Sequence, residues 1–252
     1  MHIFLSRNLS LIRGLILQLA LAVALFSPSL AVIAAPQNIT DVEMKLLPRY
    51  CPDTATFTAD PARQAYWRTI MGKGFGALHH YCWAQITMMR SRKAGVPAHI
   101  RQGMRESAAA DYIYVIQNSQ PDFILLPEIY TRLGEVDLLL GLTLKANEAF
   151  AQARRLKPDY WPAYSSWAEY LMQTGKRPEA LTVVVTGLQH SPDAKVLREQ
   201  FRLLGGKPSD VRKPVAKQPT GTDPVTSTEA VVPGDTPEPD AKSEPDAKTG
   251  DK

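Results

Sequence analysis

Hydrophobic and polar positions between residues 60 and 204 follow the spacing of α-helices. Two stripes show it most clearly: Phe75, Leu78, Cys82, Ile86 and Met89, and then Ile100, Met104, Ala108, Tyr112 and Ile116. Apolar residues every three or four positions predict helices that bury one face. Asp60 and Pro61 begin an earlier helix that runs through Trp67, since Asp is a good N-cap and Pro suits the first turn. We therefore expect an all-α fold of about seven helices.

The second half of the chain contains a repeat of 34 residues. Pro158 and Pro192 lie 34 positions apart, and an Asp follows each. The same offset aligns Tyr130 with Tyr164, Leu133 with Trp167, Gly134 with Ala168, Gly141 with Gly175, Ala146 with Ala180, Phe150 with Val184, and Ala153 with Gly187. Small residues let antiparallel helices approach closely, and glycine ends a helix in a left-handed turn. Each Pro stops a helix, and the Asp after it can cap the next one.

This pattern of aromatic, small and helix-breaking residues resembles the tetratricopeptide repeat (TPR) family. The resemblance covers two units, 127–160 and 161–194, preceded by a diverged unit at 75–121 and followed by a capping helix at 194–204. It implies a TPR-like α-solenoid of antiparallel helix pairs over residues 61–206. Asp137 stands where the family usually has an aromatic residue.

The resemblance also implies a function, because TPR solenoids usually hold a partner polypeptide in a concave groove lined by the first helix of each pair. On those helices, the residues expected to share the groove face are Glu128, Thr131, Glu135, Leu138, Ser165, Glu169 and Met172. The groove would be acidic at its rim, so the expected partner presents basic or amide groups. The face lacks the Lys and Asn residues with which some family members bind a C-terminal carboxylate.

The two ends of the chain differ from the helical part. Residues 1–34 combine Arg7 and Arg13 with an apolar run at 15–26 and a small-residue end, which predicts a signal peptide and export to the periplasm or the extracellular space. The alternative is an uncleaved segment that anchors the protein in the inner membrane. Residues 36–60 read as a loop-rich N-terminal segment. Residues 207–252 hold eight of the chain's 20 prolines and predict a disordered tail rich in Pro, Asp and Lys.

The charge distribution argues against nucleic acid as a partner. Residues 36–206 carry 20 Lys or Arg against 16 Asp or Glu, and the two signs are interleaved along the sequence. A nucleic-acid-binding face needs its positive charges clustered on one stripe or patch. We therefore expect a protein partner.

Residues 79–83, HHYCW, contain the most unusual chemistry of the chain. Cys82 lies on the same stripe as Leu78 and Ile86 and should face the core, and Cys51 is the second of only two cysteines. In an oxidising compartment two cysteines favour a Cys51–Cys82 disulfide. Two alternatives stay open: a metal site built on His79 and Cys82 and completed by His80, His99 or Cys51, or free thiols in plain helix packing.

Three classes of function remain. The sequence contains no HExxH, CxxC or CxxCH motif and no recognisable grouping of nucleophile and base, so we expect neither an enzyme nor a cofactor. The leading hypothesis is an exported protein-interaction scaffold. The alternatives are a structural subunit of an envelope secretion or polysaccharide-export assembly, and a metal or redox protein that uses residues 79–83.

Overall fold

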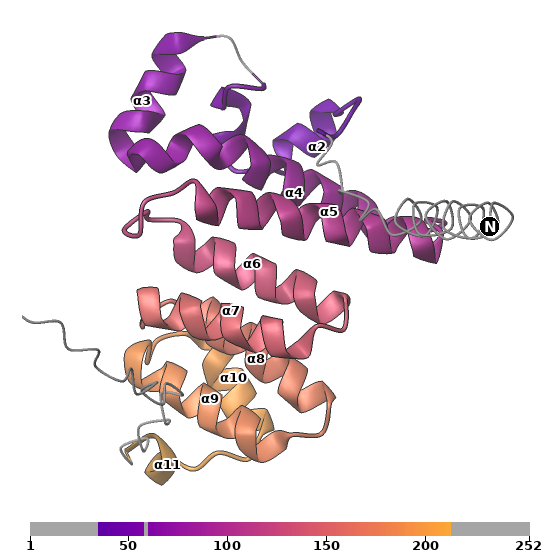
Figure 1. Ribbon diagram of the computed structural model, residues 1–252. Coiled ribbons are helices and arrows are strands. Elements are labelled where there is room, and N and C mark those ends of the chain that lie inside the picture. Colours follow the sequence, from indigo (N-terminus) through magenta and orange to yellow (C-terminus); the bar gives the residue numbers. More distant parts are fainter. Residues whose placement is uncertain (1–34, 58–59, 213–252) are drawn as a thin grey trace, which may run out of the picture. The chain divides into compact units, whose positions relative to one another are not determined.

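The computed structural model describes residues 35–57 and 60–212, and these residues form an all-α structure (Figure 1). Its α-helices are α2 (Asp41–Lys45), α3 (Pro61–Met71), α4 (Leu78–Ser91), α5 (Ala98–Gln117), α6 (Leu126–Leu139), α7 (Thr143–Leu156), α8 (Trp161–Gln173), α9 (Arg177–His190), α10 (Lys195–Leu203) and α11 (Pro208–Arg212). Two 3₁₀ turns, η1 (Cys51–Asp53) and η2 (Lys73–Ala77), precede α3 and α4 respectively. The all-α class is confirmed, with more helices than the sequence suggested. The predicted signal peptide at 1–34 and the tail beyond 212 lie outside the described residues.

Consecutive helices pack as antiparallel pairs, as expected. The pairs are α4 with α5, α6 with α7, and α8 with α9 (Figure 1). The pairs are joined because α6 also packs against α5 and α8, and α10 packs against both α8 and α9 at the end of the series. The pairs thus occupy the three units drawn from the sequence, and α10 takes the place of the capping helix.

Glycine turns close two of the pairs. Gly141 and Gly175 have φ angles of 76° and 78°, in the left-handed region that the sequence predicted for them. After Gly141, the backbone N–H of Leu142 donates to the carbonyl of Asp137 at 2.8 Å, a bond that satisfies one of the free carbonyls at the end of α6. The predicted Asp caps are wrong, since α8 and α10 have no side-chain cap. The helices begin one residue too late for Asp159 and Asp193 to be the N-caps.

Close packing between paired helices depends on small residues. A Cβ atom at Gly134 would lie 2.9 Å from Cζ of Phe150, and one at Gly187 on α9 would lie 2.9 Å from Cγ of Tyr164 on α8. Ala146 on α7 is fully buried. These positions set the distance between helices, which confirms the reason for small residues that the repeat suggested.

The N-terminal segment is more structured than a loop. Thr40 and Glu43 form a reciprocal capping box that begins α2, and the Thr40-x-x-Glu43 spacing is visible in the sequence. Glu43 also accepts two 2.8 Å hydrogen bonds from Arg90 of α4. The guanidinium of Arg90 holds the pKa of Glu43 well below its usual range. This ion pair fastens the segment to the end of α4.

Two details differ from the sequence-based expectation: the burial of the first turns of α5 and the start of the C-terminal tail. The stripe of α5 was expected to bury Ile100, but Ile100 is exposed and burial on this helix begins at Ala108. α5 has 20 residues against 14 in α4, so its first turns reach beyond their neighbour. At the other end, the predicted tail at 207–252 begins with helix α11 instead of disorder. Val211 packs against the cluster that contains Leu197, and its carbonyl accepts a hydrogen bond from Gln189.

Candidate functional site

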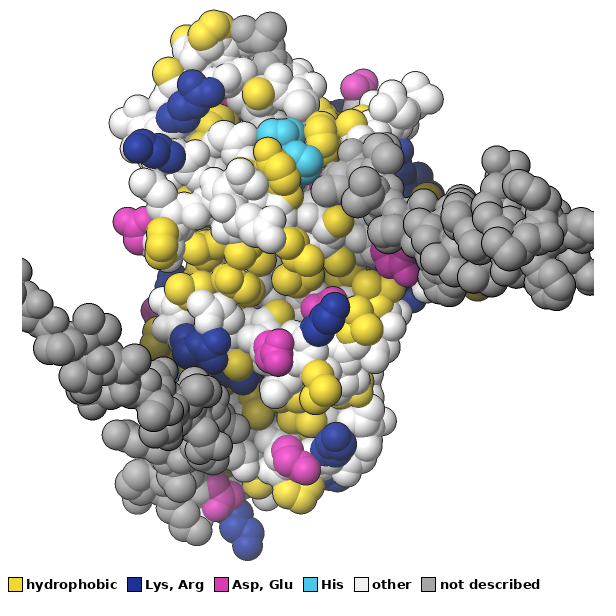
Figure 2. All heavy atoms as spheres, in the orientation of Figure 1, with side chains coloured by type: hydrophobic (Ala, Val, Ile, Leu, Met, Phe, Trp, Pro, Cys, Tyr) yellow, Lys and Arg dark blue, Asp and Glu magenta, His cyan; other side chains and the backbone are white. Residues whose placement is uncertain are grey.

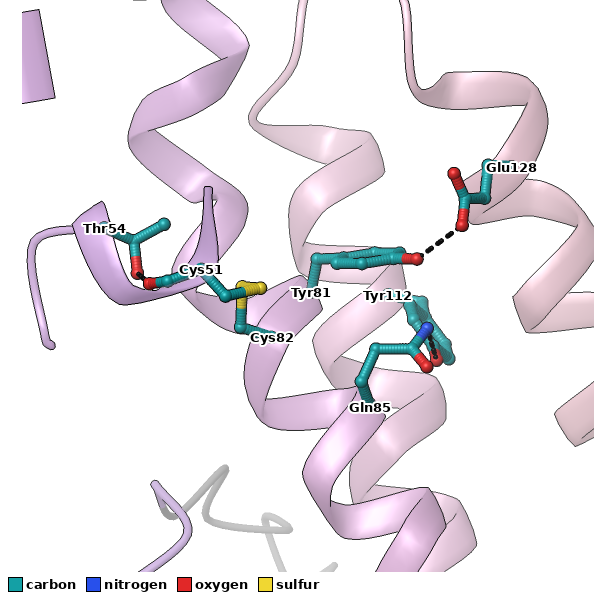
Figure 3. Close-up of a disulfide and its surroundings, with 7 residues drawn as sticks. All are labelled: Cys51, Thr54, Tyr81, Cys82, Gln85, Tyr112 and Glu128. Atoms are coloured by element: carbon teal, nitrogen blue, oxygen red, sulfur yellow. Dashed lines mark hydrogen bonds between the residues drawn. A yellow bond between two sulfur atoms is a disulfide. The ribbon is translucent and has the colours of Figure 1, made fainter. Parts of the chain in front are cut away.

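The predicted disulfide is confirmed (Figure 3). The sulfur atoms of Cys51 and Cys82 are bonded, their Cα atoms lie 5.8 Å apart, and both side chains are fully buried. The bond ties η1 to α4 across 31 residues of sequence, and Thr54 closes the turn by donating to the carbonyl of Cys51. Because both thiols are used, neither sulfur is free to ligate a metal. The disulfide suggests an oxidising compartment.

The residues of the alternative metal site are not brought together. Within residues 35–57 and 60–212, no group of three or more His, Cys, Asp and Glu side chains could hold a metal ion. Nδ1 of His79 lies 3.1 Å from the carbonyl of Gly76, and the His79 ring packs edge-on against Trp83. His99 is exposed in the first turn of α5. The histidines of HHYCW are used in local packing.

His80 forms a buried pair with Asp111 of α5. Nδ1 of His80 lies 2.6 Å from Oδ1 of Asp111, and the ring packs against both Tyr114 and Trp83. Burial raises the pKa of Asp111 to about 7 and lowers the pKa of His80. The rings of His79, His80 and Trp83 are all in contact with one another.

The predicted groove face of α6 and α8 is only partly available to a partner. Thr131 is 2% exposed and donates to the carbonyl of Pro127 in its own helix, and Ser165 is also buried. These two residues cannot line an open groove, since α6 packs directly against α8. Leu138 and Met172 are half-buried in the cluster around Trp167.

Glu128 and Glu135 of the same face are engaged within the protein. The hydroxyl of Tyr81 on α4 donates to Glu128 at 2.6 Å (Figure 3), and Ser166 on α8 donates to Glu135 at 2.9 Å. Arg132 lies between the two carboxylates, 3.8 Å from Glu128 and 3.2 Å from Glu135. This polar ladder joins α4, α6 and α8. It holds the helix pairs together. The exposed Glu169 is the one carboxylate of the predicted set without a hydrogen bond or ion pair to another helix in the described part of the chain.

An open groove lies on a different face from the predicted one. A groove of about 660 Å³ runs between α5 and α7, with α6 as its floor. Figure 2 shows hydrophobic side chains gathered over this region, with charged side chains along one edge. α5 and α7 each pack extensively against α6 and have at most slight contact with each other, which leaves the floor open. The apolar residues that line the groove include Ala109, Ala110, Ile113, Tyr130, Leu140 and Ala149.

Asp137 lies in the floor of this groove. It is 5% exposed, and its carboxylate accepts no hydrogen bond and forms no ion pair among the residues that the structure describes. Burial raises the pKa of Asp137, and the positive charge of Lys145 lowers it in part. The sequence singled out Asp137 as the departure from an aromatic position but did not indicate the groove, because that depends on the spacing of α5 and α7.

Neither a membrane span nor a known relative is found for the described helices. None of the helices in residues 35–57 and 60–212 is both long and apolar enough to cross a membrane. Comparisons with protein-family models, with curated proteins and with solved structures find no match. The functional argument therefore rests on the chain's own residues.

Proposed function

We propose that this protein is an exported scaffold, TPR-like in fold and without enzymatic activity, which binds a partner polypeptide in the groove between α5 and α7. The observation that carries the proposal is the open, mostly apolar groove whose walls come from two successive helix pairs. Its volume of about 660 Å³ lies within the range of known ligand sites, which is roughly 300–1,000 Å³. Concave, mostly apolar surfaces of this kind are typical of binding sites.

The TPR-like part of the proposal is supported by the agreement between the repeat and the packing. Gly141 and Gly175, 34 residues apart, make the same left-handed turn between the helices of their pairs. Gly134 and its repeat partner Ala168 are both buried on the first helix of a pair. Local sequence signals and tertiary arrangement thus agree at corresponding positions of two units.

The groove is a better binding surface than the predicted face on α6 and α8. On the latter face, Glu128 and Glu135 already bond to Tyr81 and Ser166, and a partner would have to break those bonds. In the groove, Ile113 is 41% exposed, so apolar surface is available without any rearrangement.

The disulfide supports the proposed compartment. A buried Cys51–Cys82 bond is typical of proteins that fold in an oxidising environment, and it agrees with the predicted signal peptide. We place the protein in the periplasm or the extracellular space.

Site-specific photocrosslinking in the native compartment tests this function. The photoreactive residue p-benzoylphenylalanine would replace Ile113 in the groove or, as the matched control, Leu144, which is 81% exposed on α7 and does not line the groove. We expect a discrete protein adduct from position 113 and none from position 144. A third variant carries the photoreactive residue at position 169. An adduct from 169 and none from 113 would return the binding surface to the face of α6 and α8. Identical adducts from 113 and 144 would contradict a groove site.

A further inference from the structure

We propose that the groove between α5 and α7 accepts an amphipathic helix that places one Lys or Arg side chain, set among apolar residues, against the carboxylate of Asp137. The inference rests on the proposed function and names the chemistry of the partner. Three properties of the groove carry it: its shape, the environment of Asp137 and the charges at its rim.

The shape of the groove fits a helix. Its two walls and its floor are themselves helices, and the ridges of an added helix can pack into such a surface at an axial distance of about 8–10 Å. Ala109 and Ala110 on one wall and Ala149 on the other are small, so a partner backbone can approach closely. A helix in a groove is anchored by apolar side chains at positions i, i+3 or i+4, and i+7.

Asp137 gives the groove its specificity. The residue is 5% exposed and lines the opening, and its carboxylate has no hydrogen-bond or ion-pair partner in the described part of the chain. A helix with only apolar residues on its bound face would cover this charge without a partner, which is costly. An ammonium or guanidinium group would instead form charge-assisted hydrogen bonds with it.

Of the rim charges, Lys145 acts on Asp137 through its positive charge but forms no ion pair with it among the described residues. Glu106 on α5 and Glu148 on α7 are balanced by Lys145 and Arg155, both on α7. The rim therefore selects no strong net charge on the partner, and the unpaired charge of the floor decides which residue lies at the centre of the bound helix. An acidic residue at that centre would be repelled by Asp137.

Selection from a peptide library on the disulfide-bonded full chain tests the inference. The library would display 18-residue amphipathic helices in which the central position of the apolar face is fully randomised. We expect Lys or Arg to be enriched at that position. In binding assays with synthetic peptides, replacing the selected cation by Met should weaken binding about 30-fold, the order of magnitude for breaking a buried charge pair.

Variants of the chain identify the residue that is responsible. With Asp137→Asn, the Lys and Met peptides should bind with dissociation constants within about twofold of each other, because the charge pair no longer exists. Asp122→Asn is the matched control, since Asp122 is exposed and does not line the groove, and it should keep the full preference for Lys. An unchanged preference for Lys in Asp137→Asn would overturn the inference.

Two blocking variants separate this inference from the proposed function. Ala110→Arg and Ile113→Glu each put a charged side chain into the groove from α5, and two variants are used so that one folded protein is available if the other fails to fold. If these variants abolish peptide binding but the selected peptides show no preference for a cation, the inference is overturned and the groove remains a binding site. Selection that yields no helix, or helices whose binding survives both variants, would overturn both. A homodimer that either variant dissociates would put a second copy in the groove and overturn the inference.

Discussion

The hydroxyl of Tyr81 donates a 2.6 Å hydrogen bond to Glu128, 47 residues further along the chain. The bond joins α4 to α6, and it uses a carboxylate that the sequence alone assigned to a binding partner. Around it, Arg132 and Ser166 extend the contacts to α8. The face formed by the first helices of the pairs thus holds successive helix pairs together, and an open surface lies between α5 and α7.

Tyr81→Phe should destabilise the protein by about 1–2 kcal/mol, since hydrogen bonds to charged groups contribute somewhat more than neutral ones. The ring keeps its packing, and Glu128 loses its shortest contact. Urea unfolding measures the change. Tyr66→Phe is the control, because Tyr66 is exposed. It should change the free energy of unfolding by less than about 0.5 kcal/mol, as is usual for a surface substitution. Equal stability of the two variants would show that the ladder does not contribute.

Removal of the disulfide in Cys51→Ala/Cys82→Ala should lower the free energy of unfolding by about 3 kcal/mol, because the unfolded chain gains the freedom of a loop of 31 residues. Reductant should destabilise the wild type by a similar amount and leave the variant unchanged. Urea unfolding with and without reductant checks both statements. A wild type that reductant does not affect would rule out the bond as a source of stability.

Gly134→Ala should destabilise the protein by about 1–3 kcal/mol, the usual cost of overpacking a core. The new methyl group would lie 2.9 Å from the ring of Phe150, which is fully buried and cannot move freely. Gly103→Ala is the matched control within a helix, since a Cβ there meets no atom within 4 Å. That substitution should stabilise by about 0.5–1 kcal/mol because alanine favours the helix. Thermal unfolding of both variants would refute the packing argument if the two changes had the same sign.

Asp111→Asn tests the buried pair with His80. Burial raises the pKa of Asp111 from 3.8 to about 7 in the folded protein, so folding retains a proton that the unfolded chain releases. The stability that Asp111 contributes is complete below pH 3.8 and is lost as the pH rises to about 7. The variant should therefore gain stability relative to wild type between pH 4 and 7, as followed by urea unfolding at several pH values. A difference that does not change with pH in that window would contradict the raised pKa.

Asp137→Asn should stabilise the protein in the absence of a partner. Burial raises the pKa of Asp137, so its charge opposes folding at neutral pH and this cost fades as the pH falls towards the normal pKa of 3.8. Unfolding experiments at pH 7 and pH 4 should show a gain for the variant that is larger at pH 7. Asp122→Asn should show no such gain. A loss of stability at pH 7 would mean that the carboxylate is satisfied within the protein.

The sequence by itself determined the local features of this protein. The spacing of apolar residues identified the helices from α3 to α10, and Gly141 and Gly175 marked where one helix ends and the next begins, because turn geometry depends on a few adjacent residues. The pairing of Cys51 with Cys82 was predictable because the chain has only two cysteines. The capping box at Thr40 was equally visible, although the segment was read as loop.

Only the tertiary structure decided which surfaces are open. Thr131 and Ser165 are buried where helices meet. The bonds of Tyr81 to Glu128 and of His80 to Asp111 each join two different helices. Helical periodicity shows which side of a helix is apolar, but it does not show how far apart two non-consecutive helices lie. The distance between α5 and α7 is set by how each packs on α6. That packing leaves Asp137 in the floor of a groove, without a hydrogen-bond or ion-pair partner among the described residues.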